Sequence, residues 1–206
     1  MKDIQMRTFE TVGDAAMTAA NMFKGPTFAG TFLKMDPRFR EKIILCVSIT
    51  NNCGVCGKVH TLVGLQAGLS EDDIQKLVTL YKKDYPKKEW LALRWARDWA
   101  VLRGETPTGK NAQAFEKAYA PEERDYIQKI CRMMKMANYT SNYLFAVPYL
   151  EKETPEPRKG ALSCLSGPVE GLLTNAVMTA RCKAAQAAEA ASDACAGFFS
   201  LNRCTA

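Results

Sequence analysis

Apolar positions along the chain recur mostly every three or four residues, the period of a helix, and almost no segment alternates as a strand does. Turn residues divide this pattern into segments of helical length. The predicted helices cover residues 11–24, 36–51, 53–68, 70–80, 86–104, 111–119 and 121–146. The pattern therefore predicts an all-α fold.

Several of these helices have recognisable starts. Asp36 followed by proline is an N-cap with proline at the first helical position, and Ser70 with three following acidic residues resembles a capping box. The helix over 121–146 presents an apolar stripe that contains Ser141, and Asn138 falls on the same face. A polar amide in such a stripe is either a hydrogen-bonded core residue or part of a site.

The composition changes after residue 150, which predicts three parts. Residues 1–150 form the helical domain, and residues 151–160, which contain two prolines, form a linker. Residues 161–206 form an appended tail rich in Ala and Cys, which the high helix propensity of alanine predicts to be helical. The tail contains four cysteines, which have no recognisable spacing: Cys164, Cys182, Cys195 and Cys204. They are either free thiols or partners for Cys53.

The formal net charge of +6 raises the question of a nucleic-acid or membrane partner. The one dense basic group, over residues 82–88, is diluted by an acid and accompanied by no nucleic-acid-binding motif, so we expect a solvated face and no nucleic acid. The longest uncharged run, residues 43–57, is shorter than the ~20 residues of a membrane span, and the N-terminus lacks a signal peptide's apolar core. We therefore expect a cytoplasmic protein with no membrane partner, whose eight cysteines are reactive, metal-binding or simply buried.

Cys53, Cys56 and His60 form the strongest chemical pattern. Their separations of three and four residues bring them to one face of a helix that begins near Cys53. The N–H groups and dipole of such a helix start favour a thiolate, the reactive form of cysteine, and histidine exchanges protons near neutral pH. The dipole favours Cys53 and the histidine favours Cys56, so the spacing leaves open which sulfur reacts first.

Glu41, in the preceding predicted helix, adds a carboxylate. If the two helices form a hairpin that turns near Asn52, Glu41 and His60 lie ~16 Å and ~12 Å from the turn, nearly level with each other. A carboxylate in that place orients the imidazole, as in other arrangements of nucleophile, base and orienting acid. The spacing therefore predicts a relay from Glu41 through His60 to Cys56.

These four residues, at separations of twelve, three and four, resemble the alkylhydroperoxidase D-like branch of the carboxymuconolactone decarboxylase family. Residues 41–70 look like the core segment of that branch, including the Ala-Gly-Leu-Ser ending at 67–70 before an acidic helix start. The likeness covers roughly residues 20–150 and excludes the tail. It implies an all-helical fold, with the CxxC motif at the N-terminus of a helix in a helical hairpin, usually assembled into homo-trimers or homo-hexamers.

The resemblance also implies roles. The expected activity is peroxide reduction or disulfide exchange, with a thiol protein or a small thiol as reductant. Cys56 would be the peroxidatic thiol and Cys53 the resolving thiol, exposed to a redox partner. His60 would be the base and Glu41 the acid behind it. Some members carry a further histidine between the cysteines, where this chain has Val55, which shortens the relay.

Other interpretations of the same residues remain open. His60 as a buried core histidine and Glu41 as a surface carboxylate paired with Arg38 or Lys42 are structural alternatives. The expectation is a thiol enzyme with no metal and no cofactor, since no Gly-rich dinucleotide fingerprint is present. A structural zinc site is the alternative, with a ligand set of Cys46, Cys53, Cys56 and His60.

Two further functions are compatible with the pattern. The first is a lactone enzyme of the decarboxylase type, although the decarboxylase branch lacks the paired cysteines. The second is a non-enzymatic protein of redox sensing or assembly that uses the tail. Outside the motif, Cys46 and Cys131 are expected to be inert packing residues, and Trp95 and Trp99 to lie in the core or at a subunit interface.

Overall fold

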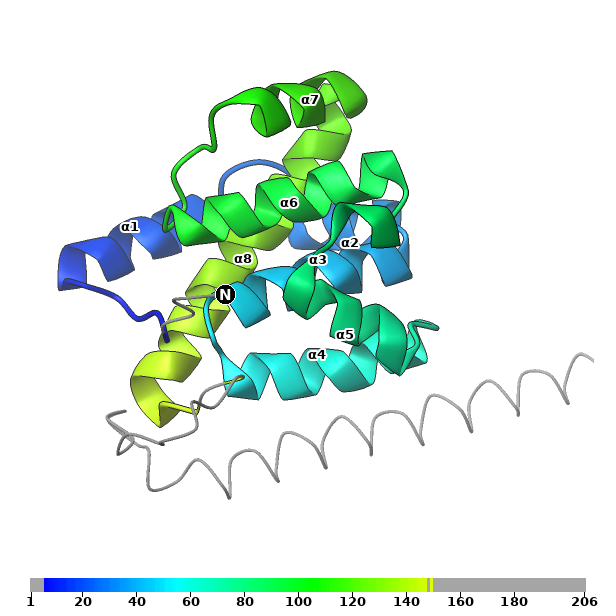
Figure 1. Cartoon of the computed structure of the whole chain (residues 1–206). Helices are drawn as coiled ribbons and strands as arrows, with labels where there is room; N and C mark the ends of the chain where they lie inside the picture. The colour runs from blue at the N-terminus through cyan, green and yellow to red at the C-terminus, as the bar shows by residue number, and fades with distance from the viewer. Residues whose placement is uncertain (1–5, 148, 150–206) are drawn as a thin grey trace, which may run out of the picture. The chain divides into compact units, whose positions relative to one another are not determined.

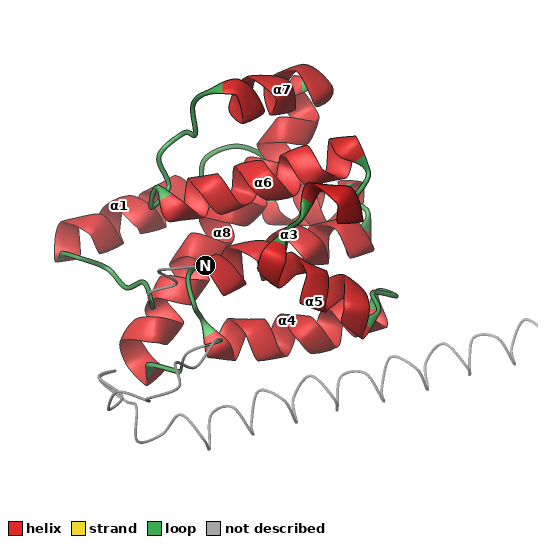
Figure 2. Ribbon diagram, in the orientation of Figure 1, coloured by secondary structure: helices red, strands yellow, loops and turns green. Residues whose placement is uncertain are grey.

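The described part of the chain, residues 6–147 and Tyr149 in a computed structural model, is built from helices and contains no strand (Figure 2). This confirms the predicted all-α class. The predicted linker and tail, with the four tail cysteines, lie outside the described residues. The elements are α1 (Val12–Met22), α2 (Phe28–Lys34), α3 (Pro37–Thr50), α4 (Gly54–Gln66), α5 (Glu71–Thr79), the 3-10 helix η1 (Lys82–Asp84), α6 (Lys87–Val101), α7 (Lys110–Ala118) and α8 (Pro121–Phe145).

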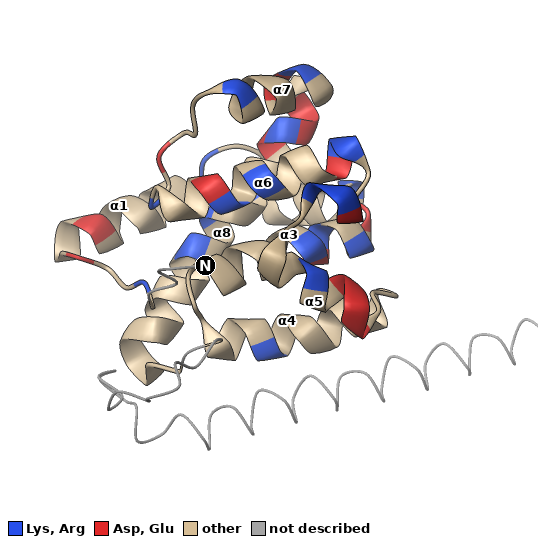
Figure 3. Cartoon of the chain, viewed as in Figure 1, with Lys and Arg blue, Asp and Glu red and all other residues tan. Residues whose placement is uncertain are grey.

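Helix α3 is the centre of this part of the fold. It packs against α4, α5, α6 and α8, which surround it in Figure 1. Its C-terminal eight residues, 43–50, are all buried, and they carry no charge (Figure 3). A helix that is apolar on every side is stable only when neighbours cover it completely. The burial of α3 therefore explains why the other helices are arranged around it.

The predicted helix starts are confirmed by their caps. The Asp36 carboxylate accepts a hydrogen bond from the Phe39 amide at 2.9 Å, and Ser70 forms a capping box with Asp73. Two short helices, α2 and η1, were not predicted, because seven and three residues are too few to reveal a period. The Thr27 hydroxyl accepts from the Gly30 amide at 3.0 Å and caps the start of α2.

A tight turn joins α3 and α4. Asn52 has a φ of 49°, a left-handed conformation that asparagine adopts more readily than most residues. The Cys53 amide donates to the Ser48 carbonyl at 3.0 Å and closes the turn. Helix α4 then runs back along α3 (Figure 1), so the predicted hairpin is present and the two cysteines lie at its tip.

The helices of the described residues are all too short or too polar to cross a bilayer.

Candidate active site

Cys53 and Cys56 lie at the start of α4. Cys53 is the N-cap residue, with an extended φ of −96°, and Cys56 is in the first helical turn. The fractional exposures of the two side chains are 1% and 8%, so both sulfurs are inside the protein. Both are free thiols in this structure. The motif therefore opens a helix, as its spacing predicts.

The environment of Cys56 lowers the pKa of its thiol to about 6. The largest cause is a hydrogen bond from the Cys53 thiol, and hydrogen bonds from Ser141 and Asn138 and the charge of His60 act in the same direction. Burial opposes them because it disfavours a charged sulfur. The donors outweigh burial, so the environment favours the thiolate form of Cys56.

The Cys53 thiol has the opposite tendency. Burial raises its pKa well above the usual range, and the neighbouring Cys56 sulfur raises it further, because Cys53 is the donor in their shared hydrogen bond. The spacing alone had left open which sulfur is the nucleophile. The geometry favours Cys56 as the thiolate and keeps Cys53 protonated.

Glu41 and His60 are in contact. The His60 Nδ1 atom lies 2.8 Å from Glu41 Oε2, and the Glu41 side chain is only 1% exposed. The second carboxylate oxygen lies 3.3 Å from Arg40 Nε. The predicted level arrangement of acid and imidazole is therefore present, and the surface alternative for Glu41 is wrong. The residues named in that alternative bind elsewhere: Arg38 pairs with Asp73 at 3.7 Å and Lys42 with Glu89 at 2.7 Å.

The bond between His60 and Glu41 forms the first link of the predicted relay, but the second link, from His60 to Cys56, is not a direct hydrogen bond. None of the hydrogen bonds made by His60 within the described residues reaches a cysteine sulfur. Its influence on Cys56 is electrostatic. The ring is about one quarter exposed, with a side-chain exposure of 24%, so part of it reaches solvent.

Helix α8 supplies two further groups: Asn138, which the sequence pattern left open as a core or site residue, and Ser141, which it did not identify as part of the site. The Ser141 Oγ atom lies 3.6 Å from the Cys56 sulfur. Asn138 is fully buried, and its amide is oriented by two bonds, since Oδ1 accepts from Asn51 Nδ2 at 3.0 Å and Nδ2 donates to Ser48 Oγ at 3.2 Å. The same NH2 group faces Cys56. The two interpretations of this asparagine, a satisfied core amide and a site residue, therefore both apply.

The segment after α8 covers the motif. The Gly54 amide donates to the Val147 carbonyl at 2.7 Å, and the ring of Tyr149 occupies the position that a Cβ on Gly57 would take. The expectation that Cys53 is exposed to a redox partner is therefore wrong for this structure. Its thiol is covered because the chain that leaves α8 packs against the tip of the hairpin, where the Gly54 amide binds the Val147 carbonyl.

The four residues considered as zinc ligands are not gathered around one point. Cys46 donates to the Leu93 carbonyl at 3.4 Å, on the side of α3 that faces α6. Nowhere in residues 6–147 or at Tyr149 do three His, Cys, Asp or Glu side chains form a group that could hold a metal ion. The other packing expectations hold: Cys46, Cys131, Trp95 and Trp99 are all buried.

A comparison with protein-family models gives a match over residues 13–100, to the carboxymuconolactone decarboxylase family. Residues 13–100 are therefore similar to members of that family. The family includes alkylhydroperoxidase D-like members. The matched segment contains all four candidate site residues, whereas Asn138 and Ser141 on α8 lie beyond it. No curated protein and no solved structure matches the chain.

Proposed function

We propose that this protein is a thiol-dependent oxidoreductase that reduces peroxides through the Cys53/Cys56 pair. The observation that carries the proposal is the opposite environment of the two thiols, in which hydrogen-bond donors lower the pKa of Cys56 and burial raises the pKa of Cys53. A thiolate is the form that attacks a peroxide, and a neighbouring thiol is what converts the product into a disulfide. An arrangement of this kind is of no use to a purely structural cysteine pair.

The first step forms a sulfenic acid. The Cys56 thiolate attacks one peroxide oxygen, the O–O bond breaks, and the leaving oxygen takes a proton to become an alcohol or water. His60 passes that proton through water, and Glu41, at 2.8 Å, holds the ring for the transfer. Ser141 and Asn138 hold the thiolate before attack.

The second step forms the disulfide. The Cys53 sulfur attacks the sulfenic sulfur of Cys56, the S–S bond forms, and the hydroxyl leaves as water with the proton that Cys53 releases. Two thiols of an external reductant, a protein dithiol or two small thiols, then return the pair to the reduced form and become a disulfide themselves. Reduction requires the segment at Val147 and Tyr149 to move, because it covers the pair.

The proposal is tested by titrating thiols before and after one equivalent of hydrogen peroxide, with mass spectrometry to locate the products. We expect a Cys53–Cys56 disulfide in the full chain. In the variant Cys53→Ser we expect a sulfenic acid on Cys56 that dimedone traps. The matched control is Cys131→Ala, which removes another buried thiol and should oxidise as the unmodified chain does.

Three outcomes contradict the proposal. If the tail cysteines are oxidised while Cys53 and Cys56 stay reduced, the chemistry lies elsewhere. If activity on a lactone survives the loss of both cysteines, the protein is an enzyme of the decarboxylase type. If peroxide turnover is negligible and oxidation changes only the oligomeric state, the pair serves sensing or assembly.

A further inference from the structure

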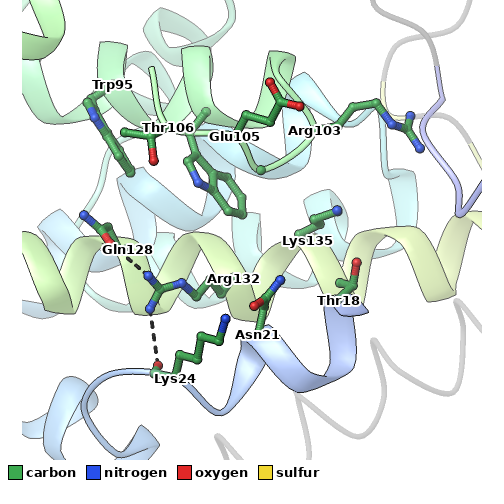
Figure 4. Close-up of a pocket in the computed structure, with 12 residues that line it drawn as sticks. Thr18, Asn21, Lys24, Trp95, Arg103, Glu105, Thr106, Gln128, Arg132 and Lys135 are labelled. Atoms are coloured by element: carbon green, nitrogen blue, oxygen red, sulfur yellow. Dashed lines mark hydrogen bonds between the residues drawn. The ribbon is translucent and has the colours of Figure 1, made fainter. Parts of the chain in front are cut away.

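A cavity of about 290 Å³ opens between α1, the end of α6 with the loop that follows it, and the middle of α8 (Figure 4). The cysteine pair is not part of its lining. Along α8, the cavity residue Arg132 precedes Ser141 by nine residues, or ~13 Å. The cavity is near the lower limit of the volumes that bind small molecules, ~300–1,000 Å³.

The charges around this cavity are unequal. Four cations and one acid line it: Lys24, Arg103, Arg132, Lys135 and Glu105. Two of the cations form ion pairs with acids that do not line the cavity: Arg103 pairs with Glu10 at 3.0 Å and Lys135 with Asp14 at 3.3 Å.

The other two cations have no acid partner within the described residues. Arg132 donates only to neutral acceptors, the Gln128 side chain at 2.9 Å and the Lys24 carbonyl at 3.3 Å. The Lys24 ammonium makes no ion pair or hydrogen bond with any described residue. Both Lys24 and Arg132 line the cavity, and in Figure 4 their side chains lie next to each other, while the carboxylate of Glu105 points away from them. Two uncompensated positive charges therefore face one cavity.

The remaining lining suits a small organic body. Two indoles, of Trp95 and Trp99, form part of the wall. Gly104 has a φ of 100°, and a Cβ there would lie 3.3 Å from Trp99 and 3.4 Å from Lys135, so the absence of a side chain keeps this side of the cavity open. Thr106 and Asn21 add neutral hydrogen-bonding groups beside the cations.

We propose that this cavity is a binding site for a small phosphate monoester with a flat apolar body. Two uncompensated cations match the double negative charge of a phosphate monoester, and guanidinium groups bind phosphate oxygens by charge-assisted hydrogen bonds. The indole walls contact the apolar body. The site is independent of the peroxide chemistry, and its ligand can bind while the cysteines are in either redox state.

The test uses phenyl phosphate as the probe, titrated by calorimetry and by the fluorescence of the tryptophans. We expect its dissociation constant to be at least tenfold lower than those of phenyl sulfate, a monoanion of the same shape, and benzamide, which is neutral. Inorganic phosphate should bind more weakly than phenyl phosphate because it lacks the apolar body. Lys24→Gln should weaken phenyl phosphate binding about tenfold, and Arg132→Lys should weaken it through the loss of the planar donor.

The matched control is Lys117→Gln, which removes an exposed cation from α7 and should change the affinity less than twofold. Equal weakening by Lys24→Gln and Lys117→Gln would mean that only the overall charge attracts the probe, and the proposal would be wrong. Equal affinities for phenyl phosphate and benzamide would likewise remove the anion site. The circular dichroism of each variant checks that the helices are intact, and Lys24→Gln, which alters only a surface side chain, keeps the test valid if Arg132→Lys unfolds.

Discussion

Two regions of the core contain buried cysteines, and they shift the pKa of Cys56 and of Cys131 in opposite directions. Cys131, in the middle of α8, and Cys46, in α3, are fully buried, and burial raises the pKa of both thiols. Cys56 is nearly as buried, yet its pKa is lowered to about 6. The difference is the supply of donors: Cys56 receives hydrogen bonds from Cys53, Ser141 and Asn138 at a helix start.

This comparison shows that burial alone does not determine the reactivity of a cysteine. Removing a sulfur from water disfavours its charge at every one of these positions. At the tip of the α3–α4 hairpin the polar residues that α8 presents replace the lost water. For Cys131, in the middle of α8, burial dominates, and the charge of Arg132 and a backbone hydrogen bond do not offset it.

The first test removes one sulfur from each of the two regions. Cys56→Ser should abolish the reaction with peroxide, a loss of more than a thousandfold in the second-order rate constant, because a serine hydroxyl is not ionised at neutral pH. Cys131→Ala should leave the rate constant within twofold. The rate constants are measured by stopped flow under excess peroxide. Equal rates for the two variants would contradict the assignment of Cys56 as the thiol that reacts with peroxide.

The second test removes the acid behind the imidazole. Glu41→Gln keeps the shape of the side chain but loses the charge that holds His60 Nδ1 at 2.8 Å. Since a positioned proton-transfer group typically contributes ~10²–10⁴-fold, the loss of its orienting partner should slow peroxide reduction by roughly tenfold or more. The pH profile should change with the rate, which a purely structural role would not produce. The control is Glu116→Gln on the surface of α7, and a Glu41→Gln rate equal to its rate would remove the relay.

The third test removes a donor from α8. Ser141→Ala removes the hydroxyl that lies 3.6 Å from the Cys56 sulfur. The thiolate is then less stabilised relative to the thiol, so the pKa of Cys56 should rise. A hydrogen bond to a charged group contributes ~1.5–3 kcal/mol, so we expect an increase of about one pH unit or more in the midpoint of the thiolate absorbance at 240 nm. Ser141→Thr, which keeps the hydroxyl, should restore a midpoint near 6. A midpoint that does not move in Ser141→Ala would mean that the donors on α8 do not stabilise the thiolate.

The smallest expected effect concerns access. Tyr149→Ala removes the ring that covers the first turn of α4, and a bulky disulfide reagent should then react with the pair several-fold faster. The pKa of Cys56 should not rise, because no hydrogen bond to its sulfur is lost and its burial can only decrease. Tyr143→Ala, at an exposed position of α8, is the control. An unchanged reagent rate in Tyr149→Ala would show that the ring does not limit access.

Much of the fold follows from local signals in the sequence. Asp36 before proline and the Ser70 capping box locate two helix starts to the residue, because capping depends on side chains next to the backbone they bind. The contact of Glu41 with His60 was also predictable. The rise per residue of a helix gives the distance of each residue from the turn of the hairpin, and the two distances are similar.

The missing parts of the site come from elsewhere in the chain. Ser141 was taken as one member of an apolar stripe, and no local pattern places it beside a sulfur 85 residues earlier. The cover formed by Tyr149 depends on the direction in which the chain leaves α8, which is set by the left-handed conformation of Ala146, with a φ of 52°. Alanine gives no sequence signal for that conformation. Periodicity identifies faces of helices, but the pairing of distant faces depends on tertiary packing.

The contact between Gly57 and Tyr149 has a consequence for how this chain can vary. The two positions are sterically coupled, since the aromatic ring fills the space of the missing Cβ. A relative with alanine in place of Gly57 must carry a smaller residue in place of Tyr149 or let that segment swing aside. Substitutions at these two positions should therefore occur together among related chains, and a chain that has lost the pair would present its dithiol openly to large reductants.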